Sequence, residues 1–270
     1  MMHKVEMLMR QAAAEAIMPR FRRLARHEVA EKSPGELVTA ADHDAERILT
    51  AGLLALRPGS LVVGEEAAAA DPAIVSRLGE GEVWLVDPLD GTANFAAGEG
   101  PFAVMVALVR NGETVAAWML DPQSGGMAQA ERGAGAVLGE ARIRAASECP
   151  PLAALRGAVF KRFLPPDLRR SIERRASVIG EMLPGLMCAG REYPAIVTGE
   201  RHFALFWRAL PWDHAPGALF AEEAGAMARR PDGTAYRPSD PRPGLLVAQN
   251  GDIWYAVRAA LLADREERTA

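Results

Sequence analysis

Apolar residues near the start of the chain lie on one face of a helix. Between charged residues they fall at helical spacing: Val5, Leu8, Met9, Ala12, Ala16 and Ile17. This pattern predicts a helix over residues 2 to about 30, which Pro19 can kink or divide because proline lacks an amide N–H. A turn at Ser33-Pro34-Gly35 and a second helix over about 40–56 are expected next.

Short apolar runs predict strands over the rest of the first half. The runs 61–63 and 83–86 each end at acidic residues. Three longer runs follow at 102–110, 114–120 and 126–131, and Asn111-Gly112 between the first two is a strong hairpin signal. The first half therefore predicts an antiparallel meander.

The pattern changes near Cys149-Pro150-Pro151 and then alternates. Strands are expected at 157–160, 185–188, 203–206 and 245–248. Helices are expected at 166–179, 192–198, 213–224 and 253–263. We therefore predict an N-terminal α+β part over 1–148 and a C-terminal α/β part over 149–270.

Composition narrows the class of protein. Of the 270 residues, 49% are hydrophobic and 24% charged, which is typical of a soluble globular protein. A net charge of -4 gives no basic surface for nucleic acid or membranes. No apolar run is long enough to span a bilayer, and the first residues do not form a signal peptide. With only Cys149 and Cys188, a reducing compartment and a cytoplasmic location are predicted.

Acidic residues gather at predicted strand ends and helix starts. They are Asp42, Glu65, Glu66, Asp87, Asp90 and Asp213. Converging carboxylates repel one another unless a cation is present. Oxygen ligands without His or Cys suit Mg²⁺, Mn²⁺ or Ca²⁺ rather than zinc. These acids thus indicate a site for a hard divalent cation.

The segment Asp87-Pro88-Leu89-Asp90-Gly91-Thr92 combines several useful groups. Pro88 stiffens the link between two carboxylates, so that both, and the Leu89 carbonyl, can face one space. Gly91-Thr92 is placed where a helix begins, and free N–H groups there suit a phosphate. Metal ligands, a phosphate cradle and a hydroxyl together favour metal-assisted phosphoryl transfer.

Each acidic motif also has a simpler interpretation when taken alone. Glu65-Glu66 is compatible with a solvated face, and Asp-Pro-x-Asp-Gly with an ordinary turn. Asp213 could cap a helix, and Asp42 could lie on a helix surface. The sequence contains no EF-hand loop, P-loop, GxSxG or HExxH motif.

Four strings in order resemble the inositol monophosphatase family. They are Leu37-Val38-Thr39-Ala40-Ala41-Asp42, Val63-Gly64-Glu65-Glu66, Trp84 to Phe95 (WLVDPLDGTANF) and Trp212-Asp213-His214-Ala215-Pro216-Gly217. The resemblance covers nearly the whole chain. It implies a layered αβαβα sugar-phosphatase fold like that of inositol monophosphatase and fructose-1,6-bisphosphatase. It also implies Mg²⁺-dependent hydrolysis of a small phosphate monoester, a homodimer, and sensitivity to lithium.

The resemblance assigns ligands for two or three Mg²⁺ ions. Glu65, Asp87 and the Leu89 carbonyl would hold one, and Asp87, Asp90 and Asp213 a second. A third, weaker ion would depend on Glu65. Mn²⁺ is expected to substitute for Mg²⁺, whereas Ca²⁺ and Li⁺ are expected to inhibit.

The resemblance also assigns catalytic and phosphate-binding roles. Thr92, hydrogen-bonded to Asp42, would orient a metal-bound water that attacks phosphorus in line without a covalent enzyme intermediate, and Glu65 would take part in this step. The N–H groups of Gly91 and Thr92 would hold phosphate oxygens. Asp90 and Asp213 would face the substrate as well as the metal.

The substrate side departs from the family pattern. Phe206 stands where the family usually has an acid that binds sugar hydroxyls, and Arg208 nearby could contribute instead. Arg191 and Glu192 either replace polyol contacts or cap a helix. His214 either faces the metal site or has a structural role at the start of its helix.

These departures leave the released alcohol open. Inositol 1-phosphate-like esters and histidinol phosphate are the main alternatives. Phosphoadenosine nucleotides are less favoured, because Ala93-Asn94-Phe95 differs from the Lys-Glu-Phe of relatives that use them. A regulatory role as a binding partner of the transcription machinery is the alternative from another class.

Overall fold

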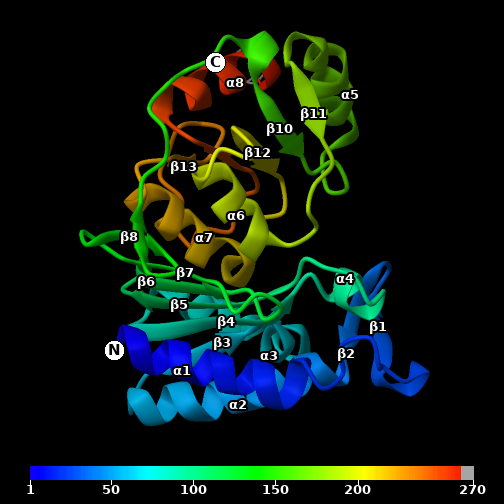
Figure 1. Ribbon diagram of the computed structural model, residues 1–270, viewed down its shortest axis with the longest axis vertical. Helices are drawn as coiled ribbons and strands as arrows, with labels where there is room; N and C mark the ends of the chain where they lie inside the picture. Colours follow the sequence, from blue (N-terminus) through cyan, green and yellow to red (C-terminus); the bar gives the residue numbers. More distant parts are fainter. Residues whose placement is uncertain (263–270) are drawn as a thin grey trace.

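The computed structural model describes residues 1–262, which form five layers in the order αβαβα (Figure 1). The first sheet has the strand order β3-β4-β5-β6-β7-β8-β9, with β3 and β4 parallel and all other neighbours antiparallel. Its strands are β3 (Leu61–Gly64), β4 (Glu82–Asp90), β5 (Ala103–Arg110), β6 (Glu113–Leu120), β7 (Met127–Glu131), β8 (Gly135–Leu138) and β9 (Ala141–Ile143). The predicted meander is confirmed, and both Asn111 and Gly112 have positive φ, as a tight hairpin turn requires. The short strands β8 and β9 were not expected.

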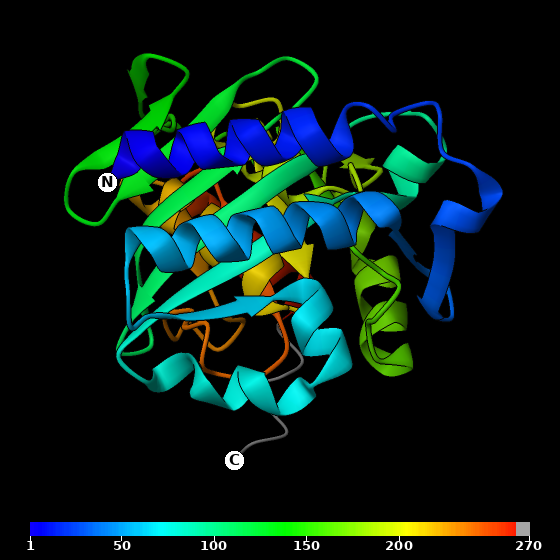
Figure 2. The ribbon, with the colours of Figure 1, turned by 90° about the horizontal axis from the view of Figure 1, so that it is seen from below.

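Two long helices cover the outer face of this sheet. Figure 2 shows α1 (Met2–Ala12) and α2 (Ala40–Leu56) lying side by side across it. Their buried apolar faces share one core with Trp84 and Trp118 of the sheet. This burial supplies the main stabilisation of the layer, because removing apolar surface from water contributes about 25 cal/mol per Å².

The prediction of one helix reaching residue 30 is wrong. Helix α1 continues as a π-helical segment, Ala13–Ile17, and ends before Pro19. The chain then forms a hairpin of β1 (Val29–Ser33) and β2 (Glu36–Thr39) around the predicted turn. Strand pairing satisfies the backbone of these residues, so the helical pattern does not extend over them.

The second sheet is smaller and mixed. Its order is β11-β10-β12-β14-β13, with β10 parallel to β11 and β12 and the remaining pairs antiparallel. Its strands are β10 (Arg156–Val159), β11 (Glu181–Leu183), β12 (Phe203–Phe206), β13 (Met227–Arg229) and β14 (Leu245–Ala248). The predicted strand at 185–188 is wrong: β11 ends before Pro184, and Met187 has a φ of 56°, which a strand cannot contain.

A middle helical layer packs between the two sheets. It consists of α6 (Ala189–Val197) and α7 (Pro211–Glu223) (Figure 1). The two helices approach closely at Gly217, where a Cβ would lie 2.0 Å from the Tyr193 ring. Glycine is therefore required at this crossing.

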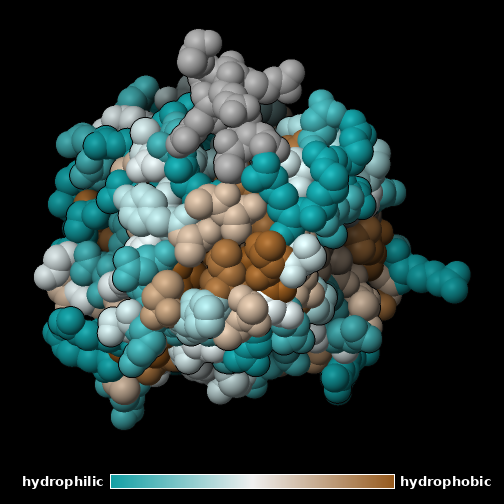
Figure 3. Space-filling view, turned by 90° about the horizontal axis from the view of Figure 1, so that it is seen from above, coloured by the Kyte–Doolittle hydropathy of each residue, from teal (hydrophilic) through white to brown (hydrophobic). Residues whose placement is uncertain are grey.

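Helices α5 (Pro166–Arg175) and α8 (Gly251–Leu262) form the last layer. Figure 3 shows this end of the molecule, where polar side chains surround a central apolar group. Two short helices, α3 (Glu65–Ala70) and α4 (Thr92–Ala96), follow β3 and β4. None of the helices in residues 1–262 is long and apolar enough to cross a membrane.

The layered αβαβα arrangement implied by the resemblance is confirmed. The two sheets come from the two sides of residue 149, but α6 and α7 pack against both. The division into parts 1–148 and 149–270 stays a prediction.

Candidate active site

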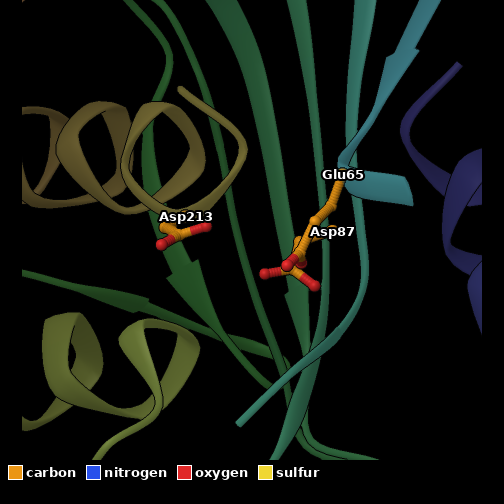
Figure 4. A group of neighbouring side chains, drawn as sticks. All are labelled: Glu65, Asp87 and Asp213. Atoms are coloured by element: carbon orange, nitrogen blue, oxygen red, sulfur yellow. The ribbon is translucent and has the colours of Figure 1, made fainter. Parts of the chain in front are cut away.

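Carboxylates from three separate segments converge in a cleft between the first sheet and the middle helices. Glu65 begins α3, Asp87 lies in β4, and Asp213 lies in the first turn of α7. One oxygen from each lies within 4.8 Å of the others. Figure 4 shows Glu65 and Asp87 close together, with Asp213 facing them from α7. We call these three residues the carboxylate cluster.

An irregularity in β4 directs its acids into the cleft. Asp87 pairs with Met105 and Asp90 with Ala103, so β4 advances three residues while β5 advances two. In a regular strand, residues three apart point to opposite faces. The extra residue is a bulge, which changes the direction of the following side chain and tolerates Pro88. Asp87 and Asp90 can therefore line the same cleft.

The position of Glu65 depends on a buried acid from another helix. Glu46 of α2 accepts hydrogen bonds from the N–H groups of Glu66 and Ala67, each at 2.9 Å, and so caps α3. A Cβ at Gly64 would lie 2.3 Å from the Glu46 carboxylate, which explains the glycine before the two glutamates. Sequence reasoning missed Glu46. The sequence indicates its role only by placing this acid four residues after Asp42, among the apolar residues of α2.

Electrostatics at the cluster favours a cation. Loss of hydration, followed by the charge of Glu65, raises the pKa values of Asp87 and Asp213 well above the usual aspartate range. The Lys32 ammonium lies 2.7 Å from Glu65 and 2.5 Å from Glu66 and compensates part of the charge. The donors of the cluster are all carboxylate oxygens, which Mg²⁺ prefers. The residues present therefore fit a hard divalent cation.

Asp90 lies beside the cluster and also anchors α6. One of its oxygens accepts the Gly190 N–H at 2.6 Å, at the start of that helix. A Cβ at Gly190 would lie 2.5 Å from that of Ala103, so only glycine permits this approach. Burial raises the pKa of Asp90 to about 6, while the Gly190 bond opposes the rise. Each carboxylate oxygen has two lone pairs, so Asp90 can accept this bond and still face a cation.

Asp42 and Thr92 meet as the resemblance implies. The Thr92 hydroxyl lies 3.1 Å from Asp42 and 2.9 Å from the Leu89 carbonyl oxygen, and it can donate its proton to either. Asp42 is fully buried and also accepts the N–H and hydroxyl of Thr39. Burial raises its pKa to about 7. The Leu89 carbonyl keeps a second lone pair for another partner.

The Gly91-Thr92 turn places backbone N–H groups at the cleft. Gly91 has a φ of 87° and precedes the first residue of α4. A Cβ there would lie 2.9 Å from the Pro101 carbonyl oxygen. The first N–H groups of a helix have no acceptor within the helix, so those of α4 can bind a ligand.

The predicted substrate residues divide into two groups. Arg208 and Phe206 line the cleft. Glu192 does not: it is fully buried, accepts the Leu186 N–H, and pairs with Arg201 at 2.8 Å. Arg191 pairs with Glu200 on the surface. The expectation that Glu192 contacts the substrate is therefore wrong, because its carboxylate holds the start of α6 against the preceding loop.

His214 has the structural role considered from the sequence. It is buried, and its ring nitrogens contact the Tyr193 hydroxyl at 2.9 Å and the Arg208 carbonyl at 3.2 Å. Burial lowers its pKa to about 3, so the ring is neutral. It supports the backbone next to Arg208 rather than carrying charge into the cleft.

Comparisons with known proteins agree with this arrangement. The family model described as the inositol monophosphatase family matches residues 2–270. An inositol-1-monophosphatase of Rhizobium meliloti is 30% identical over 87% of this chain and 86% of its own length. The Nus factor SuhB of Vibrio cholerae is 31% identical over 73% of each chain. The solved structure of the extragenic suppressor protein suhB from Bartonella henselae is 25% identical, has a TM-score of 0.80, and covers 96% of this chain and 98% of that one. The chain belongs to the inositol monophosphatase family.

Proposed function

We propose that this protein is a Mg²⁺-dependent hydrolase of small phosphate monoesters. The observation that carries the proposal is the convergence of Glu65, Asp87 and Asp213 beside the Gly91-Thr92 turn. A cation site next to free N–H groups suits a phosphate dianion. The match to the inositol monophosphatase family supports the same activity.

The carboxylates would hold two Mg²⁺ ions, with a third bound more weakly at Glu65. Glu65, Asp87 and the Leu89 carbonyl suit one ion, and Asp87, Asp90 and Asp213 suit the second. Mn²⁺ would replace Mg²⁺, whereas Ca²⁺ and Li⁺ would inhibit. When bound, the ions lower the pKa of the attacking water and stabilise charge on the leaving oxygen.

The chain's own groups would position the reactants. N–H groups of Gly91 and Thr92 would hold phosphate oxygens. The Thr92 hydroxyl, kept in place by Asp42 and the Leu89 carbonyl, would orient the attacking water on the side of Glu65. No nucleophilic side chain is required, so the attack on phosphorus would be direct and in line.

The test is phosphate release from a panel of monoesters, with Mg²⁺ and with a chelator. We expect activity only with Mg²⁺, and none in Asp90→Asn, whose circular dichroism should match the wild type. Turnover near that of the wild type in this variant would overturn the proposal. Inositol 1-phosphate and histidinol phosphate belong in the panel because both remain candidate substrates.

A regulatory role is the second candidate, favoured by the relatives called Nus factor SuhB. In that role the chain would act by binding the transcription machinery. Deletion of the gene and complementation with Asp90→Asn separate the two functions. Full rescue by this inactive variant would favour the binding role, and no rescue would favour catalysis. A homodimer and a cytoplasmic location stay predictions.

A further inference from the structure

The cleft has a second wall whose chemistry differs from that of the carboxylate cluster. Aromatic and guanidinium side chains dominate this wall, which we call the aromatic wall: Phe160, Arg162, Phe163, Phe206 and Arg208. They come from the segments that follow β10 and end β12. Because the phosphate is expected at the carboxylates, this wall faces the alcohol part of an ester.

Phe206 forms the buried centre of the aromatic wall. Its ring stacks on Phe160 with centroids 4.6 Å apart and 23° between the planes. Tyr193 stacks at 5.7 Å, and the His214 ring lies at 4.6 Å. Rings at these separations attract one another. With only 5% of Phe206 exposed, this part of the wall is fixed before a substrate arrives.

Phe163 forms the exposed rim of the wall, with 39% of the residue accessible. The guanidinium carbon of Arg208 lies 4.1 Å from its ring centroid, and that of Arg162 lies 5.0 Å away. The β1–β2 hairpin holds both cations: Arg162 donates to the Gly35 carbonyl at 3.0 Å, and Arg208 pairs with Glu36. The rim is thus a flat ring flanked by cations.

The polar acceptors beside this wall are already engaged. Glu36 accepts from Arg208 and Ser33, and the His214 ring is bonded to Tyr193 and a backbone carbonyl. A polyol placed here would find guanidinium donors, but few free acceptors for its hydroxyl protons. A flat π-rich ring would lose little hydration and gain stacking on aromatic and guanidinium planes.

We propose that the alcohol part of the substrate carries a flat, π-rich ring that is neutral or anionic. This inference rests on the proposed phosphatase function and specifies its substrate class. Two guanidinium groups also disfavour a positively charged alcohol, which counts against histidinol phosphate with its ammonium group. The aromatic wall is therefore the specificity-determining part of the cleft.

The test compares kcat/KM, with saturating Mg²⁺, for a panel of esters in which the phenyl and cyclohexyl members are matched in leaving group. 2-Phenylethyl phosphate is compared with 2-cyclohexylethyl phosphate, β-glycerophosphate, inositol 1-phosphate, histidinol phosphate and adenosine 2′-monophosphate. We expect the esters with a neutral flat ring to exceed β-glycerophosphate and inositol 1-phosphate by about tenfold or more. The cyclohexyl ester should fall below the phenyl ester, since it has no π face.

Preference for inositol 1-phosphate or histidinol phosphate would overturn this inference while leaving the phosphatase proposal intact. Equal rates for the phenyl and cyclohexyl esters would also overturn it, because simple apolar burial would then suffice. If no ester releases phosphate, the proposed function fails and the inference fails with it.

Substitution of Phe163 tests whether the aromatic wall causes the expected preference for esters with a flat ring. Phe163→Leu keeps an apolar side chain but removes the π face, so the phenyl-to-glycerol ratio of kcat/KM should fall about fivefold to tenfold. Tyr255→Leu, an exposed aromatic of α8, is the matched control and should leave the ratio unchanged. An unchanged ratio in Phe163→Leu would contradict the assignment.

Discussion

The two walls of the cleft are built in different ways. The carboxylate cluster stands on a strand and two helix starts, and the buried carboxylates of Glu46 and Asp90 accept backbone N–H groups of the helices beside it. The aromatic wall stands on segments that leave the second sheet, and it is held by ring stacking and by the β1–β2 hairpin. In the proposed function, the chemistry would therefore depend on the strand and helix starts that carry the carboxylates, whereas the choice of alcohol would depend on the rings and guanidinium groups of the aromatic wall.

The difference suggests that the two walls can change independently. A substitution in the aromatic wall leaves the bulge in β4 and the capped start of α3 untouched. A substitution in the carboxylate cluster should instead affect every ester equally. The following experiments test this separation.

The largest effect is expected for Asp87→Asn. Losing a ligand shared by the two proposed ions should reduce kcat about 1,000-fold or more, since several kcal/mol of transition-state stabilisation are removed. The loss should be equal for ring esters and polyol esters. Asp252→Asn on α8 is the control and should keep full activity. A loss of activity toward only one class of ester would contradict the idea that the two walls can change independently.

The second-largest effect is expected for substitution of Glu46, which positions Glu65 by capping α3. Glu46→Ala removes both acceptors that cap α3, so Glu65 should lose its fixed position. We expect the Mg²⁺ concentration for half-maximal rate to rise about tenfold, with a smaller rise in Glu46→Gln, which retains one acceptor oxygen. An unchanged Mg²⁺ dependence in a folded Glu46→Ala protein would show that the cap does not position the metal site.

Removal of divalent cations should make stability depend on pH. The pKa of Asp90 is raised to about 6 and that of Asp42 to about 7, mainly by burial. The folded state then binds more protons than the unfolded chain between about pH 4 and pH 7, so stability falls as pH rises through this window. The fall should be on the order of 7 kcal/mol, because the two pKa values together lie about five units above the usual aspartate value and one unit corresponds to about 1.4 kcal/mol. Urea titrations in chelator measure it, and saturating Mg²⁺ should reduce it, because Asp90 is a proposed ligand whereas Asp42 is not. A stability that rises across this window in chelator would contradict the account.

The smallest effect is expected for Lys32→Met. The Lys32 ammonium lies against Glu65 and competes with a cation for its oxygens. Its removal should lower the half-saturating Mg²⁺ concentration a few-fold. Lys161→Met removes an exposed lysine paired with Glu173 and is the control. A weaker response to Mg²⁺ in Lys32→Met would mean that Lys32 assists the metal instead of competing with it.

The carboxylate cluster was accessible from the sequence because its motifs are local. The bulge, the turn and the helix start all lie within Asp87 to Thr92, and Asp213 lies two residues after Pro211, which opens its helix. The family resemblance then supplied the remaining partner, Asp42. The structure confirms the Asp42–Thr92 contact and the convergence of Glu65, Asp87 and Asp213.

Tertiary packing explains what the sequence did not reveal. Glu46 can cap α3 only because α2 packs beside that helix. Glu192 does not reach the cleft because it pairs with Arg201, nine residues away. The apolar run near Met187 suggested a strand, yet it lines the cleft as a loop. The rim at Phe163 forms only when the β1–β2 hairpin meets the segment after β10.

Glu65, Asp87 and Asp213 are proposed to form a divalent-cation site. The most direct measurement is a Mn²⁺ titration followed by electron paramagnetic resonance, for the wild type and for Asp213→Asn. We predict at least two bound Mn²⁺ ions in the wild type, and loss of at least one or a tenfold weaker site in the variant. Identical binding by both proteins, or no binding by the wild type, would contradict the account.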